Sequence, residues 1–364
     1  MIGDNIVVDG ISHAQDMRPD RVLPAGEILR DLNQQINDAL PVAARVPGRD
    51  AVGALPTADN MCNSIFLESD VDVAVTHHLP LYSYVEGGLV PIEANQALAD
   101  RAPARWVVYA GVDPTAGVAE AIESLEQQVD LLPQTVGLKL YPVHLNPLRT
   151  LQVDKEEYYP LWERARELGI RVISVHKAVP YGPVPIHPFR VEDVAGAAGA
   201  FPDLAFEIMH GGVAFVEETA MMISRFDNVY TNLEGLGFMQ YQDPGSFEKA
   251  IASFQAAGAI HKVIWGTGGP QLGHPQFYLQ NFLKFQFSQE VLDAFQIDPL
   301  TEEQRFGVLG RNFLGMAGID VEELKGRLVG DEYDQKLRRH GRLEPMFSTW
   351  TPTASEQSDQ KVRA

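Results

Sequence analysis

The sequence contains little cysteine, a deficit of basic residues and no long apolar run. A single cysteine, Cys62, in 364 residues excludes an intramolecular disulfide and fits a reducing compartment. Lys and Arg number 29 against 49 Asp and Glu, and the net charge of −20 argues against a nucleic-acid partner, because such a partner requires a basic face. No segment approaches the run of about 18 apolar residues that spans a membrane.

The N-terminal stretch MIGDNIVVDG also lacks the basic and apolar regions of a signal peptide. We therefore expect a cytoplasmic protein with no nucleic-acid and no membrane partner. No G-x-G-x-x-G follows the first apolar segment, so little supports a dinucleotide-binding fold. A small-molecule substrate is the partner most compatible with these absences.

From about residue 105 onward, short β-rich segments alternate with amphipathic helical patterns. The β-rich segments are almost continuously apolar, which is typical of a parallel sheet covered by helices on both faces. Two earlier segments, 5–13 and 70–78, bring the number of strands to eight, the count of an α/β fold of the (β/α)8 TIM barrel type. A doubly wound open sheet would also fit the alternation. The later expected strands are residues 105–114, 135–143, 171–177, 204–212, 229–235 and 262–270.

Two regions fall outside this repeat, and the rest predicts a single barrel domain over residues 1–330. Residues 14–69 form a long Pro- and Asp-rich excursion between the first two strands. In a barrel such a loop lies over the catalytic face, where it acts as a lid or contacts another subunit. Residues 331–364 become polar and basic, so we expect a C-terminal arm or a frayed tail rather than a domain.

Several histidines are expected at the carboxyl ends of the strands, where barrel enzymes place their chemistry. His13 ends the first strand, His176 the fifth and His210 the sixth. His77 and His78 end the second strand, and side-chain alternation predicts that one points into the barrel while the other packs outward.

The same alternation predicts which side chains share the mouth of the barrel. Residues 9, 11 and 13 lie on one face of the first strand, so we expect Asp9, His13, Lys139 and His176 to converge. Lys139 either neutralises a substrate carboxylate or pairs with a neighbouring acid. Among the loop histidines, His274 is a further candidate because it lies just after the eighth strand.

Histidines gathered in this way suit a divalent metal. Neutral imidazoles bind Zn²⁺ and similar ions, and a catalytic site keeps one position open for water. The metal lowers the pKa of that water towards about 7 and so provides a nucleophile at neutral pH. A further histidine then acts as a general base or stabilises developing charge.

Several motifs together resemble the amidohydrolase-related family that includes aminocarboxymuconate-semialdehyde decarboxylase. The resemblance runs from residue 5 to about residue 320, and its order and spacing are more specific than any single motif. A closing segment, FGVLGRNFLGMAGI, is similar to the family's final helix, with Asn312 in place. The other motifs are VVDGISH (7–13), GLKLYP (137–142), ISVHK (173–177), MHGG (209–212) and IWGTGGP (264–270).

The resemblance implies a metal-dependent hydrolase or non-oxidative decarboxylase on a barrel that is often dimeric. Carried over by position, His13 and His176 match metal ligands, and His210 matches a histidine that works on water or substrate. Two positions depart from the family: Ile11 replaces the first ligand, and Gly268 stands where the eighth strand offers an aspartate.

Three arrangements of the site are compatible with these departures. A divalent metal, Zn²⁺ first and Mn²⁺ or Co²⁺ next, is held by His13, His176 and His210, with His77, His78 or His274 substituting for the missing ligands. Alternatively, Asp9 or Glu234 supplies the missing carboxylate. In the third arrangement the site is metal-free and the histidines act as acid and base. We predict the first, with His210 and Lys139 as catalytic residues.

The predicted function is hydrolysis of a C–N or related bond in a small carboxylated, cyclic or aromatic compound by a homodimer or higher homo-oligomer. Non-oxidative decarboxylation of an aromatic or unsaturated acid is the alternative, and a non-catalytic barrel is the third possibility. Lys139 and Lys177 are candidates for binding a substrate carboxylate. Aromatic residues near strand ends suit a flat substrate, although core packing explains them equally well. They are Tyr82, Tyr84, Tyr109, Tyr141 and Trp265.

Overall fold

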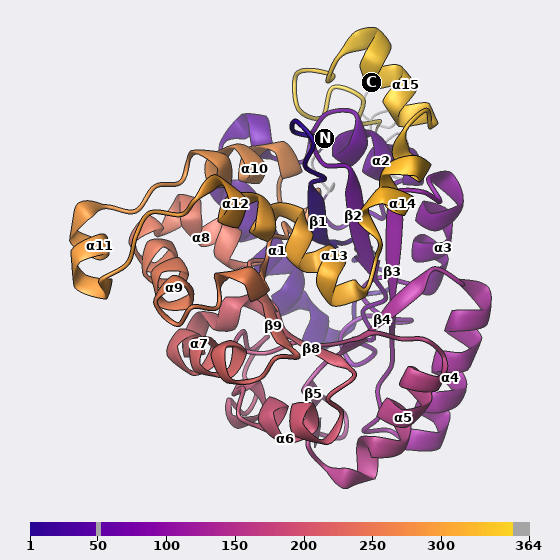
Figure 1. Ribbon diagram of the computed structural model, residues 1–364. Helices are drawn as coiled ribbons and strands as arrows, with labels where there is room; N and C mark the ends of the chain where they lie inside the picture. Colours follow the sequence, from indigo (N-terminus) through magenta and orange to yellow (C-terminus); the bar gives the residue numbers. More distant parts are fainter. Residues whose placement is uncertain (49–51, 352–364) are drawn as a thin grey trace.

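The computed structural model describes residues 1–48 and 52–351, in which eight parallel strands form one sheet (Figure 1). Neighbouring strands in the sheet follow one another in the chain, apart from a small hairpin formed by β5 (Val143–His144) and β6 (Arg149–Thr150). Every strand expected from the sequence is present, which confirms the barrel prediction. The eight strands are β1 (Val8–Ser12), β2 (Val73–His77), β3 (Trp106–Gly111), β4 (Thr135–Leu140), β7 (Val172–Val175), β8 (Ala205–Ile208), β9 (Val229–Asn232) and β10 (Val263–Ile264).

The sheet closes between β1 and the segment that follows β10. The amide of Gly10 donates to the carbonyl of Trp265 at 3.0 Å, and the amide of Gly268 donates to the carbonyl of Ile11 at 2.8 Å. A parallel bridge between His13 and Pro270 continues this seam. Closure brings the carboxyl ends of all eight strands around one mouth.

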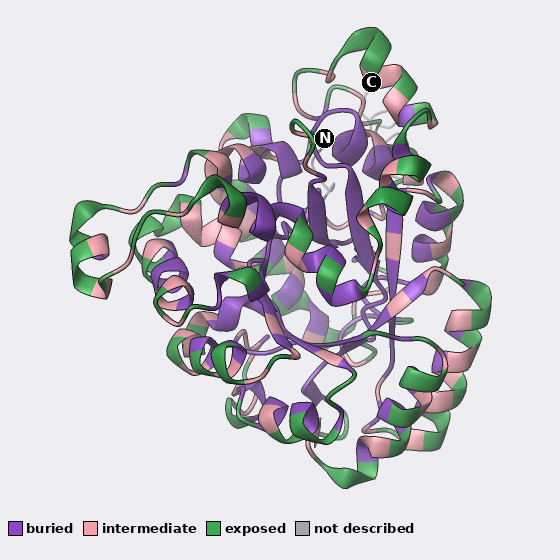
Figure 2. Ribbon diagram, in the orientation of Figure 1, coloured by how far each residue is buried: buried purple, intermediate pink, exposed green. Residues whose placement is uncertain are grey.

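Helices surround the strands, and their buried faces pack on the sheet while their outer faces are exposed (Figure 2). Local capping explains several boundaries: at α9, Asp243 accepts a hydrogen bond from the Ser246 amide and Pro244 takes the first helical position. The helices between strands are α1 (Glu27–Ala39), α2 (Ala58–Phe66), α3 (Ile92–Arg101), α4 (Val118–Leu131), α5 (Tyr159–Glu167), α6 (Asp193–Ala200), α7 (Val216–Arg225), α8 (Leu236–Gln242) and α9 (Pro244–Ala256). The helices after the last strand are α10 (Pro275–Lys284), α11 (Gln289–Phe295), α12 (Glu302–Phe306), α13 (Asn312–Ala317), α14 (Val321–Leu328) and α15 (Glu332–His340).

The segment α13–α14 closes the amino-terminal end of the barrel. Asn312 donates to the carbonyls of Ile260 and Val263 at 3.0 and 2.7 Å, at the start of β10. Phe313 and Leu324 join the apolar cluster formed by strand residues that include Val8, Val75 and Ile264. Because this end is filled, the chemistry has to be sought at the opposite, carboxyl end.

The excursion of residues 14–69 contains α1 and α2, and it packs on loops at the carboxyl ends of the strands. Three of its backbone contacts reach these loops: Gln15 binds Gln271, Leu23 binds Tyr84, and the Ala44 carbonyl accepts from the His274 amide at 3.0 Å. The excursion therefore covers part of the mouth. Its role as a lid or as an oligomer contact stays a prediction.

The C-terminal arm is tied to the barrel as far as residue 351. Glu68, which is fully buried, accepts hydrogen bonds from the amides of Phe347 and Thr349, both at 2.7 Å, and one from the Ser348 hydroxyl. The rest of the predicted tail, residues 352–364, lies outside the described residues. Within residues 1–48 and 52–351, none of the helices has the length and apolar composition needed to cross a membrane.

Candidate active site

Five side chains from five strand ends meet at the mouth of the barrel. His13 follows β1, Lys139 lies in β4, His176 follows β7, His210 follows β8 and Glu234 follows β9. None of these five residues exposes more than 8% of its surface. The structure thus brings together all four residues proposed for metal binding or catalysis, and adds Glu234.

The first strand does not keep the even alternation predicted for residues 9, 11 and 13. Its register with β2 shifts between Asp9 and Ser12. The Asp9 carboxylate accepts hydrogen bonds from the amide and hydroxyl of Thr267, at 2.9 and 2.6 Å, and from the Ile11 amide. Burial raises the pKa of Asp9 to about 7. Asp9 thus holds the loop after β10, and its convergence with His13 at the mouth stays a prediction.

His210 is positioned by a turn in which three consecutive residues have positive φ. The values are 66°, 59° and 68° for His210, Gly211 and Gly212. A Cβ at Gly211 would lie 2.1 Å from Leu236, and one at Gly212 would lie 1.9 Å from Thr219, so the MHGG motif requires its glycines. For His210 itself this conformation costs about 1 kcal/mol, a strain that is concentrated at functional sites.

A hydrogen-bonded chain links Glu234, His210, His176 and the backbone. His210 Nδ1 forms an ion pair with Glu234, and His210 Nε2 lies 2.9 Å from His176 Nδ1. His176 Nε2 in turn lies 2.8 Å from the Val179 carbonyl. Both ring nitrogens of each histidine are thus engaged.

The Val179 carbonyl sets the protons along this chain, because a carbonyl can only accept. His176 Nε2 must donate to it, and burial keeps the pKa of His176 well below its usual value, so His176 is neutral and its Nδ1 accepts. His210 Nε2 must then donate to His176. The Glu234 carboxylate also only accepts, since its pKa is lowered to about 2, chiefly by His210 working against burial, which would raise it. His210 is thus held with Nε2 towards His176 and Nδ1 towards the Glu234 carboxylate.

Lys139 is a buried ammonium without an oxygen partner among the described residues. Its Nζ donates to Met209 Sδ and lies 5.0 Å from the centre of the Tyr141 ring. Burial lowers the pKa of Lys139 to about 7, while the charges of Glu207 and Glu234 act in the opposite direction. An ammonium in such a place is suited to receive an anionic group of a ligand.

The centre of the His13 ring lies 5.2 Å from the centre of the His77 ring. Burial lowers the pKa of His13 to about 4, so the ring is neutral, and its Nδ1 has no hydrogen-bond partner among the described residues. His77 points inward, with Nε2 3.2 Å from the Gly10 carbonyl, whereas His78 contacts the Val90 carbonyl. The prediction that only one of His77 and His78 points into the barrel is confirmed.

Two other sequence candidates have structural roles. His274 caps α10 by accepting from the Gln276 amide, and its Nε2 lies 3.2 Å from Glu68. Lys177 forms an ion pair with Asp193 at 2.7 Å and also donates to the Pro188 carbonyl. Because both side chains are fully engaged and buried, neither belongs to the site.

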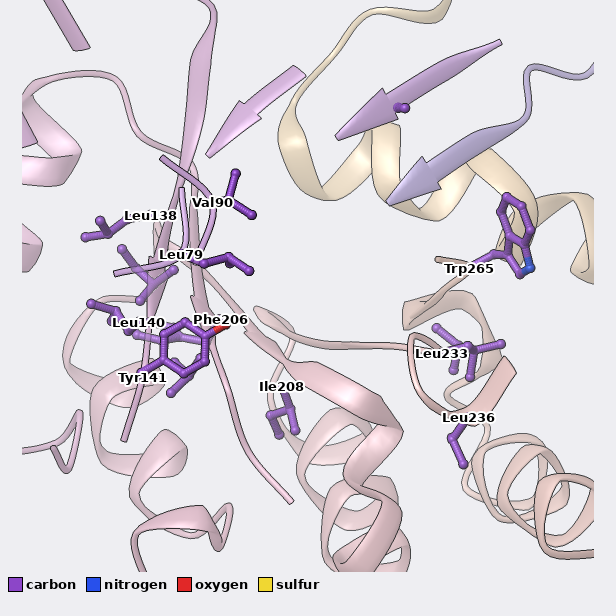
Figure 3. Close-up of a cluster of buried hydrophobic side chains, with 14 of the residues drawn as sticks. Leu79, Val90, Leu138, Leu140, Tyr141, Phe206, Ile208, Leu233, Leu236 and Trp265 are labelled. Carbon is purple, nitrogen blue, oxygen red and sulfur yellow. The ribbon is translucent and has the colours of Figure 1, made fainter. Parts of the chain in front are cut away.

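Aromatic rings form one wall of the site. Tyr141 stacks on His176 at 4.9 Å between ring centres, and Tyr181 meets the same ring edge-on at 5.1 Å. Figure 3 shows Tyr141 among buried apolar side chains such as Leu140 and Phe206. Of the other predicted aromatic residues, Trp265 is buried in the core.

The sequence offered both Asp9 and Glu234 as the missing carboxylate. The contact that distinguishes Glu234 is with Gly268, a residue distant in the sequence. Gly268 has a φ of 69°, and a Cβ there would lie 2.8 Å from Glu234 Oε1. The Glu234 carboxylate therefore fills the space next to the position at which the resemblance placed an aspartate. Val179 and Met209, whose contacts set the states of His176 and Lys139, carried no signal in the sequence.

The eight-stranded closed sheet and its polar mouth define a TIM-barrel protein with an enzyme-like site. The family model described as Amidohydrolase matches residues 36–312, so the chain belongs to the amidohydrolase family. Among curated proteins, no sequence matches this chain.

Solved structures with low sequence identity share the fold. An uncharacterised TIM-barrel protein from Bordetella bronchiseptica is 18% identical, with a TM-score of 0.59 over 86% of this chain and 99% of that chain. A probable 2-pyrone-4,6-dicarboxylic acid hydrolase from Acinetobacter baumannii is 14% identical, with a TM-score of 0.50 over 86% and 99%. A dihydroxybenzoic acid decarboxylase from Polaromonas, solved with manganese and an inhibitor, is 13% identical, with a TM-score of 0.51 over 86% and 97%. At these identities the likeness extends to the fold alone.

Enzymes of this superfamily are metal-dependent, but the residues present here do not fit such a centre. The facing nitrogens of His176 and His210 bind each other rather than converge on a shared point. Within residues 1–48 and 52–351, no group of three His, Cys, Asp or Glu side chains is placed to hold a metal ion. The assignment of His13, His176 and His210 as ligands stays a prediction.

Proposed function

We propose that this chain is a hydrolase of the amidohydrolase superfamily that acts on a small carboxylated, cyclic or aromatic compound. The observation that carries the proposal is the hydrogen-bonded chain from Glu234 through His210 to His176, next to the unpaired ammonium of Lys139. Such an arrangement offers positive charge and proton donors in a buried setting, where electrostatic stabilisation of a developing oxyanion is strongest.

Each residue has a distinct task in this mechanism. Lys139 binds an anionic oxygen of the substrate, and His210, oriented by Glu234, donates a proton or hydrogen bond to the oxygen that gains charge. His13 is neutral and its Nδ1 has no partner among the described residues, so it accepts a proton from the attacking water and returns it to the nitrogen or oxygen that leaves when the C–N or C–O bond breaks. His176 keeps His210 in the required orientation.

The choice of substrate class draws on the site and on the relatives together. An ammonium beside the Tyr141 ring suits a flat acid, and the printed names of two structural relatives are those of a pyrone dicarboxylic acid hydrolase and a dihydroxybenzoic acid decarboxylase. We extend this class, a carboxylated ring compound, to the present chain. We also propose a cytoplasmic homodimer or higher homo-oligomer.

A metal-dependent form of the same hydrolysis is the rival mechanism. It places a divalent ion, Zn²⁺ first, on His13, His176 and His210. To bind it, His176 and His210 would have to break their mutual hydrogen bond.

Decarboxylation is the second candidate activity, and the contact between Lys139 and Tyr141 favours it, since an aromatic carboxylate fits there. The two activities are separated by assaying a panel of carboxylated lactones, cyclic amides and aromatic acids for ring opening and for CO2 release. We expect ring opening that falls at least 100-fold in His210→Gln. Release of CO2 from an aromatic acid would establish the decarboxylase instead, and no turnover of any compound would favour a non-catalytic barrel.

A further inference from the structure

At two positions where the family has metal ligands, this chain has no donor side chain. Other groups fill the space at both positions. Ile11 is fully buried, and its side chain packs so closely on Gly266 that a Cβ there would lie 2.8 Å from it. The space beside Gly268 is taken by the Glu234 carboxylate. Neither position has room for a metal and a ligand without rearrangement of its neighbours.

The facing nitrogens of His176 and His210 are committed to each other rather than to a metal. His176 Nδ1 and His210 Nε2 lie 2.9 Å apart, while His176 Nε2 contacts the Val179 carbonyl and His210 Nδ1 contacts Glu234. A metal ligand must present a nitrogen with a free lone pair, so neither ring can bind an ion in this arrangement.

A positive charge lies in the same mouth. The Lys139 ammonium is buried and near enough for its charge to act on both His13 and His176. Ion pairing does not neutralise it, because no carboxylate in the described part of the chain comes within ion-pair distance of Nζ. A divalent cation between the three histidines would be repelled by this ammonium.

We infer that the Lys139 ammonium supplies here the positive charge that other amidohydrolases draw from a metal, and that no divalent metal binds between His13, His176 and His210. The inference deepens the proposed function, because the same ammonium would hold an anionic oxygen of the substrate. The claim that no metal binds is tested without any substrate. It can therefore fail while the proposed hydrolase activity stands, and the proposed activity can fail while this claim stands.

The test is metal analysis of the purified full chain, followed by calorimetric titration with Zn²⁺, Mn²⁺ and Co²⁺. We expect less than about a tenth of an equivalent of bound metal and no saturable binding that depends on the histidines. His176→Ala and the more conservative His176→Gln serve as matched variants, in case one of them folds poorly. Metal that persists undiminished in both variants lies elsewhere and leaves the inference intact.

One equivalent of metal in the wild type that is lost in either folded His176 variant would overturn the inference. A second readout is the nitrogen-15 NMR spectrum of histidine-labelled protein at pH 7. We expect the signals of His176 and His210 to stay unchanged when Zn²⁺ is added. A change in both sets of signals that saturates at one equivalent of Zn²⁺ would contradict the inference.

Discussion

The Glu234 carboxylate occupies the space that any side chain at Gly268 would need, since a Cβ there would lie 2.8 Å from Oε1. Glycine at the end of β10 and glutamate at the end of β9 are therefore complementary. The resemblance places an aspartate after the eighth strand, where this chain has Gly268. Glu234, after β9, supplies a carboxylate at the mouth instead. The same carboxylate then fixes the orientation of His210.

Gly268→Ala is expected to displace Glu234 and so to inactivate the enzyme. Gly258→Ala is the matched control, because Gly258 has nearly the same φ, 70° against 69°, but open space around it. Both variants should lose about 1 kcal/mol of unfolding free energy from the left-handed conformation. Urea unfolding and turnover together check this, and equal turnover in the two variants would contradict the proposed role of Glu234.

Lys139→Met should make the protein more stable and less active. A buried ammonium without an ion pair disfavours folding, so its removal should raise the unfolding free energy at pH 6 by at least about 1 kcal/mol. The folded pKa of about 7 lies below the ordinary value of 10.5, so the folded protein takes up fewer protons between these values. The advantage of the variant should thus be full below pH 7 and fade as the pH rises towards 10.5.

Lys177→Met is the matched comparison for Lys139→Met. Lys177 is equally buried but forms an ion pair with Asp193, so its loss leaves an uncompensated buried carboxylate. We expect destabilisation by about 3 kcal/mol or more, measured by thermal and urea unfolding. A Lys139 variant that is destabilised as much as the Lys177 variant would mean that Lys139 is a structural residue.

Acid stability should depend on Glu234. Its pKa is lowered from 4.5 to about 2, mainly through His210, so the carboxylate stabilises the fold above pH 4.5 and this contribution is lost as the pH falls towards 2. Glu234→Gln should show a flatter decline of unfolding free energy across this range. Identical slopes for the two proteins would show that the pair with His210 does not form in solution.

Glu68 is predicted to hold the C-terminal arm. Glu68→Ala removes the acceptor of three hydrogen bonds from residues 347–349, so residues 341–351 should become accessible to protease and the fold should lose about 3 kcal/mol. Ser348→Ala, which removes one of these bonds, should cost only about 1 kcal/mol. Equal protease resistance of the wild type and Glu68→Ala would show that other contacts hold the arm.

Much of the fold follows from local patterns, and much of the site does not. Eight apolar segments separated by amphipathic helices leave few arrangements other than a barrel, and a barrel brings the ends of its strands together. The convergence of His13, Lys139, His176 and His210 was therefore predictable. The register shift after Asp9 was not, because it depends on hydrogen bonds from Thr267, a residue far away in the sequence.

The charge state of the site was equally hidden from the sequence. It depends on one backbone carbonyl, that of Val179, and on one steric relationship, that of Glu234 and Gly268. Backbone acceptors and excluded volumes have no residue-type signature. The histidines alone suggested a metal site, and only their contacts with each other and with the backbone argue against it.

The most direct test of this account is steady-state turnover by protein dialysed against a strong chelator, with Glu234→Gln measured in the same buffer. We expect the dialysed wild type to keep its kcat/KM within about twofold, and Glu234→Gln to lose at least 100-fold, a typical loss for a group that orients a catalytic acid or base. Loss of wild-type turnover on dialysis, restored by one equivalent of Zn²⁺, would contradict the account.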